Sequence, residues 1–283
     1  MQIYRFWECR RENICGTEAY FKAGSNESPE HAAQLLKDKI DIFRRFNDPG
    51  VPDPTPKEVA ELRCRLAGNK DYSVPICEEF VEQIDARNIV TRNRSGALVL
   101  NSEDHAFFDI DFDCLPPAGL WHKLQVILGK RPAQTPEERL FDIIRSQLND
   151  SFPYTPARLY RTAKGFRLLL NISHDADSPE TANIMRMFHC DRLYAELCSR
   201  QKCFRARLTP KPRRIGVTGA SKFRFPYAEE TVPAHKLWVE QYEKKSADFA
   251  VCRLVKSFGP EFRSPVIEYH DRMCNCSSPL PLA

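Results

Sequence analysis

Apolar positions follow the helical period in some parts of the chain and the strand period in others. The helical period and N-cap sequences predict helices over residues 28–46, from 55 onward, and over 77–86, 119–129, 136–149, 179–189, 191–201, 234–244 and 264–273. Alternation and turn signals predict strands over residues 1–8, 18–23, 88–93, 96–100, 106–112, 158–162, 165–172, 204–208 and 221–226. Residues 248–257 fit either a strand or a helix. Helices and hairpins are interleaved rather than strictly alternating, so the predicted fold class is α+β.

The predicted strand within residues 105–113 has the most informative pattern, with the sequence HAFFDIDFD. Side chains alternate between the two faces of a strand, so Asp109, Asp111 and Asp113 are expected on one face and the apolar residues on the other. Carboxylates on one face repel each other, and a hard divalent cation such as Mg²⁺ or Mn²⁺ would offset this repulsion. The alternative is a solvated acidic face at the end of a strand.

Basic residues are concentrated in one segment although the net charge is only +4. Residues 197–228 contain no acidic residue and nine basic ones: Arg200, Lys202, Arg205, Arg207, Lys211, Arg213, Arg214, Lys222 and Arg224. Such a concentration favours contact with phosphates of a nucleotide or a nucleic acid. The alternative is a solvated basic face balanced by acidic residues elsewhere in space.

Two groups of cations are candidates for phosphate binding. The first is at the tip of the predicted hairpin 158–172, where Arg161, Lys164 and Arg167 surround a glycine turn. The second comprises Arg205, Arg207 and Lys211, of which the two arginines share one face of a strand. Alternatively, Arg205 and Arg207 form a structural salt-bridge network with Asp109 and Asp111.

Composition and motifs argue against several classes of protein and of binding site. No run of about 18 apolar residues is present, so we expect no membrane-spanning helix and no membrane partner. The eleven cysteines are odd in number and scattered, which favours free thiols in a reducing, cytoplasmic setting. Cys190, Cys198 and Cys203 lack the close pairing typical of zinc sites, and the pair Cys274 and Cys276 receives no role. Glycine-rich phosphate loops, dinucleotide fingerprints and nucleophile elbows do not occur in the sequence.

Residues 107–111 resemble the first motif of the archaeo-eukaryotic primase superfamily, in which apolar residues lead to Asp-x-Asp. A later hairpin of that superfamily ends in a nucleotide-binding His, and Arg167 stands at the corresponding place. A third carboxylate follows in the superfamily, and Asp191 is the best-placed match, although it also fits a helix cap. The resemblance implies a primase-polymerase-like palm with an RRM-like mixed or antiparallel sheet flanked by helices.

This resemblance implies one α+β catalytic-type domain over residues 1–273, followed by a flexible tail at 274–283. Within the domain we expect an N-terminal α/β part at about 1–104 and a palm-like part at about 105–260. The chain also resembles, along most of its length, an uncharacterised group of bacterial proteins, which implies no particular chemistry. That resemblance rests on residues 5–7, 91–93, 96–101, 160–162, 204–212 and 267–272.

Three functions are consistent with these residues. The first is a metal-dependent nucleotidyltransferase of primase-polymerase type, in which Asp109, Asp111 and Asp191 bind Mg²⁺ or Mn²⁺ and a nucleoside triphosphate reacts on single-stranded nucleic acid. The phosphate ligands would be Arg161, Lys164, Arg167, Arg205, Arg207 and Lys211. The second is a catalytically inactive relative that binds nucleic acid, which Arg167 in place of His favours. The third is a metal-dependent nuclease.

Overall fold

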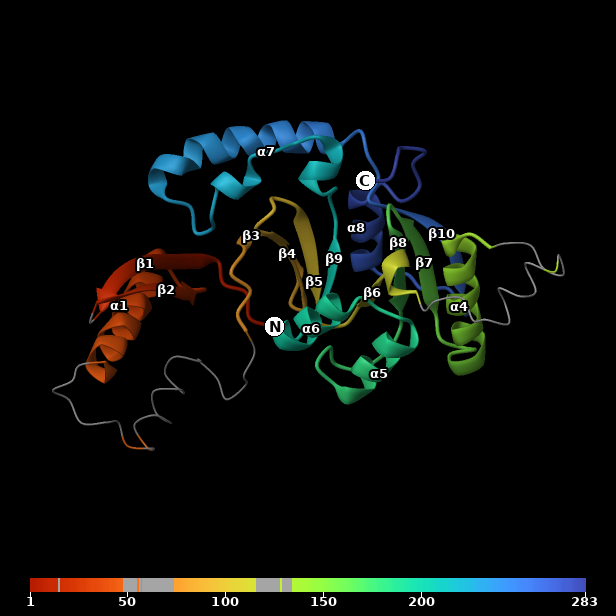
Figure 1. Ribbon diagram of the computed structural model, residues 1–283, viewed down its shortest axis with the longest axis horizontal. Helices are drawn as coiled ribbons and strands as arrows, with labels where there is room; N and C mark the ends of the chain where they lie inside the picture. Colours follow the sequence, from red (N-terminus) through yellow and green to blue (C-terminus); the bar gives the residue numbers. More distant parts are fainter. Residues whose placement is uncertain (15, 48–54, 56, 58–73, 116–127, 129–133) are drawn as a thin grey trace.

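The computed structural model describes residues 1–14, 16–47, 55, 57, 74–115, 128 and 134–283 (Figure 1). It is an α+β structure in which hydrogen-bonded strands run antiparallel, as the interleaved pattern predicts. In the described part of the chain, no helix combines the length and the apolar character needed to cross a bilayer.

A hairpin and one helix form a small unit with its own apolar core at one end of the molecule (Figure 1). Strand β1 (Phe6–Ile14) pairs with β2 (Thr17–Ser25), and helix α1 (Pro29–Phe46) packs on the pair. The Ser28 side chain accepts a hydrogen bond from the backbone N–H of His31, so the predicted N-cap determines where α1 begins.

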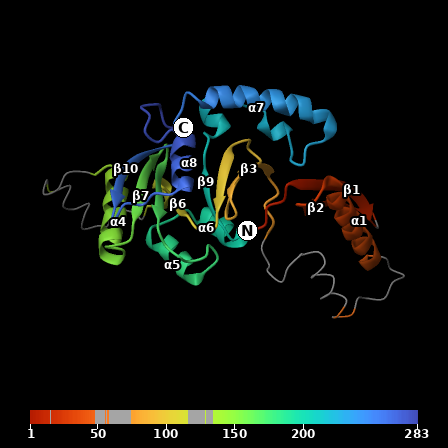
Figure 2. The same ribbon diagram turned by 180° about the vertical axis from the view of Figure 1, so that it is seen from behind.

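Two four-stranded sheets form the rest of the β structure. The first has the order β3 (Glu79–Asp85), β4 (Asn88–Arg92), β5 (Leu98–Ser102) and β9 (Phe204–Arg207). The second has the order β10 (Cys252–Phe258), β7 (Ala157–Thr162), β8 (Gly165–Leu170) and β6 (Ala106–Asp111). Edge strands β9 and β6 lie side by side, and both views show this seam near the middle of the molecule (Figures 1 and 2).

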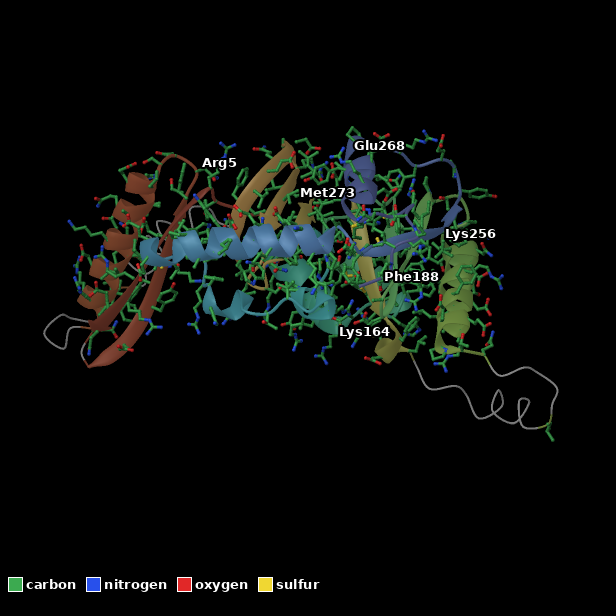
Figure 3. All side chains as sticks on the ribbon, turned by 90° about the horizontal axis from the view of Figure 1, so that it is seen from above. Arg5, Lys164, Phe188, Lys256, Glu268 and Met273 are labelled. Atoms are coloured by element: carbon green, nitrogen blue, oxygen red, sulfur yellow. The ribbon has the colours of Figure 1, made fainter. Side chains whose placement is uncertain are left out.

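Helices cover both faces of the second sheet. Phe108 and Ile110 of β6 point into a core shared with α4 (Pro136–Ser151), α5 (Pro179–Met187) and α6 (Arg192–Gln201). Phe107 points the other way, into a core shared with α8 (Pro265–Met273). Helix α7 (Val232–Ser246) runs along the long axis of the molecule above the strands (Figures 1 and 3). Strand β6 is therefore buried between two layers of helices.

Most predicted elements are confirmed, two are wrong, and the strand predicted over residues 1–8 is displaced to Phe6–Ile14. Residues 77–86, predicted as a helix, contain strand β3, because pairing with β4 satisfies backbone groups that the local sequence would have placed in helical bonds. Residues 221–226, predicted as a strand, contain only the end of a 3-10 helix, Ala220–Lys222. Other 3-10 helices are Phe112–Cys114, Pro212–Ile215 and Glu229–Thr231. The predicted helices beginning at 55 and covering 119–129 lie largely outside the described residues.

The expected division of the chain also differs from the observed contacts. Strand β9 belongs to the part predicted to begin at residue 105, yet it completes the sheet formed by β3, β4 and β5. Residues 274–283, predicted as a flexible tail, pack against the fold. The backbone N–H of Ala250 donates to Pro281 O over 2.9 Å, and the N–H of Ala283 donates back to Ala250 O over 3.0 Å. The tail therefore has backbone partners that the sequence pattern does not reveal.

Candidate metal and phosphate site

The register between β6 and β8 places the two central aspartates next to the hairpin. Asp109 lies opposite Arg167, and Asp111 lies opposite Gly165. A Cβ atom at Gly165 would lie 2.0 Å from the carbonyl oxygen of Ile110, so only glycine allows β8 to approach β6 this closely. The small residue predicted at the hairpin tip thus serves the strand pairing next to Asp111.

Asp109 is held by both its backbone and its side chain. One carboxylate oxygen, Oδ1, accepts a hydrogen bond from Nε of Arg167 over 3.3 Å. Its carbonyl oxygen accepts from the backbone N–H of Asp191 over 3.0 Å and from the Cys190 thiol over 3.1 Å. The side chain remains 32% exposed, so Asp109 is fixed in place while part of its carboxylate stays accessible.

Asp111 is half-buried, and its carboxylate has no hydrogen bond or ion pair with any residue that the structure describes. Burial and then repulsion from Asp109 raise the pKa of Asp111, whereas Lys211 and Arg214 lower it to a smaller extent. Asp113 does not share the face of the other two aspartates, contrary to the prediction. The strand ends at Asp111, and Asp113 lies exposed in the following 3-10 helix.

Arg167 is buried beneath Asp109 and is not available to a phosphate, contrary to the role predicted for it. Its side chain is 2% exposed. Besides the contact with Asp109, Nη1 donates to the carbonyl oxygen of Arg207 over 2.9 Å and lies 3.2 Å from Nε2 of His270. Burial alone would lower the pKa of Arg167, but the nearby Asp109 carboxylate raises it overall, which keeps the guanidinium charged. Arg167 is therefore a positioning residue for Asp109.

Three cations near the aspartates have no hydrogen bond or ion pair from their side chains to the described residues: Arg207, Lys211 and Arg214. Burial lowers the pKa of Arg207, and repulsion from Arg167 and Arg214 adds to this effect, although Asp109 opposes it. Repulsion from Arg207 is the main cause that lowers the pKa of Lys211. These cations repel one another, so an anion bound among them would be stabilised.

Other predicted phosphate ligands lie outside this group. Arg205 contacts both carboxylate oxygens of Glu78 over 2.7 Å, so it forms a structural ion pair rather than a contact with the aspartates. Arg161 of β7 pairs with Glu137 of α4 over 2.8 Å. Its side chain lies on the face of the sheet opposite to the face that carries Arg167 of β8. Lys164 is exposed at the tip of the β7–β8 hairpin (Figure 3).

Asp191 lies close to the other two aspartates but also caps a helix. One carboxylate oxygen accepts from the backbone N–H of Tyr194, at the start of α6, over 2.7 Å. The charge of Asp191 contributes to the raised pKa of Asp111. Groups of three potential ligand atoms within 4.8 Å of one another occur elsewhere in the described residues, and not among Asp109, Asp111 and Asp191. Its role as third metal ligand stays a prediction.

The site lies where the two sheets meet, and side chains rather than a backbone ladder join them there. The Tyr194 hydroxyl donates to the carbonyl oxygen of Phe107 in β6 and accepts from the backbone N–H of Arg205 in β9, over 3.3 Å for the latter. Burial raises the pKa of Tyr194 well above its ordinary value, so the hydroxyl keeps its proton. Tyr194 thereby sets the spacing between the strand of the aspartates and the strand of Arg207.

Comparison of the chain with protein-family models, curated proteins and solved structures gives no match. A functional assignment therefore depends on the chemistry of the side chains themselves.

Two contributors to the site were missed by the sequence reasoning. Arg214 was counted only as part of the basic segment, and its position follows from the 3-10 helix Pro212–Ile215, which begins with a proline. Tyr194 gave no signal in the sequence, because its role depends on two distant backbone groups.

A recess of about 1060 Å³ lies away from this site, between the hairpin β1–β2 and α1, and its lining does not include the aspartates.

Proposed function

We propose that the chain is a metal-dependent nucleotidyltransferase of primase-polymerase type that acts on single-stranded nucleic acid and a nucleoside triphosphate. The observation that carries the proposal is the half-buried pair Asp109 and Asp111, in which Asp111 has no partner among the described residues. Arg167 offsets part of the charge of Asp109, but Asp111 still repels Asp109, and Mg²⁺ or Mn²⁺ would supply the missing positive charge through the oxygen ligands it prefers.

The unpaired cations supply the second half of the site. Arg207, Lys211 and Arg214 are close enough to the aspartates for each to alter the pKa of a neighbour. Carboxylates beside free cations fit a metal–triphosphate complex, because the metal binds the carboxylates while the remaining phosphate charge binds the cations. A purely structural network would pair these groups with one another.

The bound metal would orient the triphosphate and stabilise the charge that develops as a 3′-hydroxyl attacks in line. The protein contributes positioning. Asp109 is held by Arg167 and by the backbone of Asp191, while Arg207 is held through its carbonyl oxygen by the same Arg167. One buried guanidinium therefore fixes a metal ligand and a phosphate ligand relative to each other.

A catalytically inactive nucleic-acid-binding protein is the second candidate, and a specific observation favours it. Arg167, which stands in place of the nucleotide-binding His of primases, donates to an oxygen of Asp109 and already supplies part of the positive charge that a metal would bring. In this alternative the cations bind the nucleic-acid backbone, and the aspartates bind no catalytic metal.

The test incubates the full chain with primed and unprimed single strands, labelled nucleotides and Mn²⁺. We expect labelled extension products, and we expect Asp111→Asn to reduce the rate by more than the roughly 10- to 100-fold typical for loss of an outer-shell metal partner. The matched control is Asp113→Asn, because Asp113 is exposed two residues further on. Binding without extension would support the inactive relative, and degradation of the strands would identify a nuclease.

A further inference from the structure

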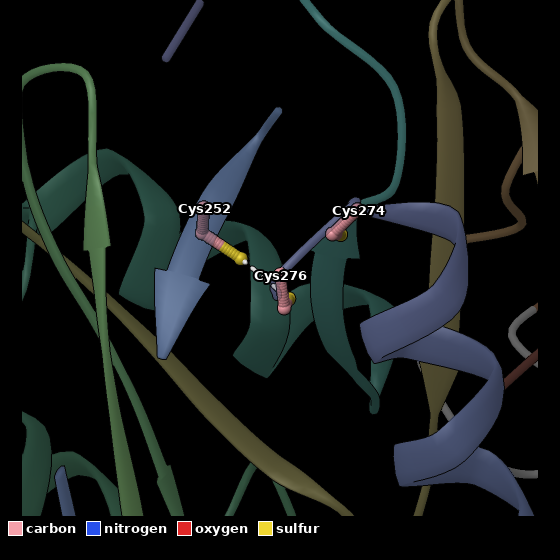
Figure 4. Close-up of side chains that lie close together, drawn as sticks. All are labelled: Cys252, Cys274 and Cys276. Carbon is pink, nitrogen blue, oxygen red and sulfur yellow. Dashed lines mark hydrogen bonds between the residues drawn. The ribbon is translucent and has the colours of Figure 1, made fainter. Parts of the chain in front are cut away.

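Three buried thiols meet next to Arg167, one from β10 and two from the segment that follows α8. The Sγ atoms of Cys252, Cys274 and Cys276 all lie within 4.8 Å of one another, and those of Cys252 and Cys276 are 3.6 Å apart (Figure 4). His270 and Asp271 form a second group with the same Cys276, again within 4.8 Å. The exposed fraction is 0% for Cys252, Cys274 and His270, and 2% for Cys276.

The backbone brings these residues together by a defined turn at the end of α8. Asn275 has a φ of 55°, a left-handed conformation that asparagine tolerates better than most residues. The backbone N–H of Cys276 donates to Asp271 O over 3.0 Å, which turns the chain back toward the helix. Cys252 lies at the start of β10, and its side chain points toward Cys276 (Figure 4).

The distances fit a tetrahedral metal better than a disulfide. With metal–sulfur bonds of about 2.3 Å, tetrahedral geometry separates two sulfur ligands by roughly 3.8 Å. The observed 3.6 Å between Cys252 and Cys276 is close to this value and far above the roughly 2.05 Å of a disulfide bond. Soft thiolates with one imidazole select zinc rather than the hard cations suited to carboxylates.

The charges around the cluster are compatible with a bound dication. Three thiolates, one neutral imidazole and Zn²⁺ carry a net charge of −1, which needs a buried counter-ion. Arg167 provides it, because its Nη1 lies 4.0 Å from Sγ of Cys274. Oδ1 of Asp271 accepts a hydrogen bond from Nδ1 of His270 over 2.9 Å, which is how carboxylates commonly orient metal-binding histidines.

We propose that Cys252, Cys274 and Cys276 form a structural zinc site that joins β10, α8 and the C-terminal segment, and that Nε2 of His270 becomes the fourth ligand by giving up its contact with Arg167. Binding of Zn²⁺ displaces one proton from each of the three thiols to solvent, so no oxidant or reductant takes part. All four ligands are buried and come from the protein, which makes the site closed and structural rather than catalytic. Cys274 of this site contacts Arg167, so the site would also help to hold Arg167 in its contact with Asp109.

The decisive experiment uses the full chain purified with reduced thiols. We expect one zinc ion per chain, and we expect replacement of zinc by Co²⁺ to give thiolate-to-cobalt charge-transfer absorption with the intense visible bands of tetrahedral cobalt. A protein without zinc that gives no such spectrum with reduced thiols would overturn the proposal. A disulfide between Cys252 and Cys276, detected by thiol counting and peptide mapping in the freshly isolated protein, would also overturn it.

Variants separate the thiol cluster from ordinary buried cysteines. Cys276→Ser is expected to weaken zinc binding by more than about 100-fold, beyond the loss typical for an outer-shell partner. Cys203→Ser is the matched control, because Cys203 is equally buried but belongs to another core cluster. If both variants retain stoichiometric zinc, the assignment is wrong. If Cys276→Ser does not fold, the cobalt spectrum of the unmodified chain decides the question alone.

Discussion

Arg167 separates two polar clusters that differ in exposure, in ligand chemistry and in how completely their groups are paired. The carboxylate cluster (Asp109, Asp111 and Asp191) is partly exposed, offers hard oxygen ligands and leaves Asp111 without a partner among the described residues. The thiol cluster (Cys252, Cys274 and Cys276) is buried and offers soft sulfur ligands. The partly exposed oxygen ligands suit a metal that also binds exchangeable ligands, whereas the buried sulfur ligands suit a metal that stabilises the fold.

Replacing Arg167 tests the connection between the clusters and has the largest expected effect. Arg167→Met leaves the partly buried Asp109 carboxylate and the carbonyl oxygen of Arg207 without their donor, which we expect to cost about 3–5 kcal/mol of unfolding free energy. Urea-induced unfolding measures this loss.

The matched control is Arg145→Met, which removes an exposed ion pair with Asp142 and should cost less than about 1 kcal/mol. Equal losses in the two variants would mean that Arg167 does not link the clusters.

Addition of Mn²⁺ to the purified full chain tests the carboxylate cluster separately. At about 100 times its dissociation constant, Mn²⁺ should stabilise the fold by about 2.7 kcal/mol, measured as a rise in melting temperature. The double variant Asp109→Ala with Asp111→Ala should lose this rise, whereas Asp113→Ala should keep it. The comparison fails if Mn²⁺ stabilises the double variant as much as the unmodified chain.

The unpaired cations should appear in the salt dependence of single-strand binding. If Lys211 and Arg214 each contact one phosphate, replacing both by Ala should reduce the slope of log affinity against log salt by about 1.4, or about 0.7 for each contact. Arg145→Ala on the exposed face of α4 should leave the slope unchanged. Titrations of a labelled strand at several salt concentrations measure the slope, and an unaltered slope in the double variant would exclude these contacts.

The pH dependence of stability gives the smallest and most specific test. The folded protein raises the pKa of Asp111 above the value in the unfolded chain. The free energy of unfolding is therefore highest at low pH, where the carboxyl is protonated in both the folded and the unfolded protein, and it falls as pH rises through the pKa of the folded protein. Asp111→Asn should therefore stabilise the metal-free protein at pH 7, by less than about 1 kcal/mol since the group is partly solvated.

The gain should disappear as the pH falls below about 3.9, the ordinary pKa of an aspartate. Urea unfolding at a series of pH values measures it. Asp113→Asn, which alters an exposed carboxyl, should show no such pH-dependent gain; the same behaviour in both variants would contradict the assignment.

Local patterns predicted much of the fold because short-range signals determine those elements. Ser28 before a proline gave the start of α1, and the apolar alternation around Asp109 gave β6. Strand β3 was mistaken for a helix because the deciding contact is pairing with β4, which no local preference contains. Asp113 was placed on the wrong face because alternation cannot show where a strand ends.

The candidate site was predicted less completely, since pairing partners lie far away in the sequence. Arg205 and Arg207 are equivalent by alternation, yet Glu78 binds the former, whereas the side chain of the latter has no hydrogen bond or ion pair to the described residues. The thiols of Cys274 and Cys276 received no role, because Cys252 is more than twenty residues earlier in the chain. Spacing rules recognise ligands that are near in sequence, and this cluster forms only when β10 and α8 meet.

The tyrosine bridge between β6 and β9 has a mechanical consequence. Within the described residues, side-chain hydrogen bonds such as those of Tyr194 and Arg167 join these strands instead of a backbone ladder. A ladder resists separation because many bonds must lengthen together, whereas a few side-chain bonds give way more easily. Asp109 and Arg207 lie in two different sheets, so the distance between them depends on a few side-chain hydrogen bonds, above all those of Arg167 and Tyr194.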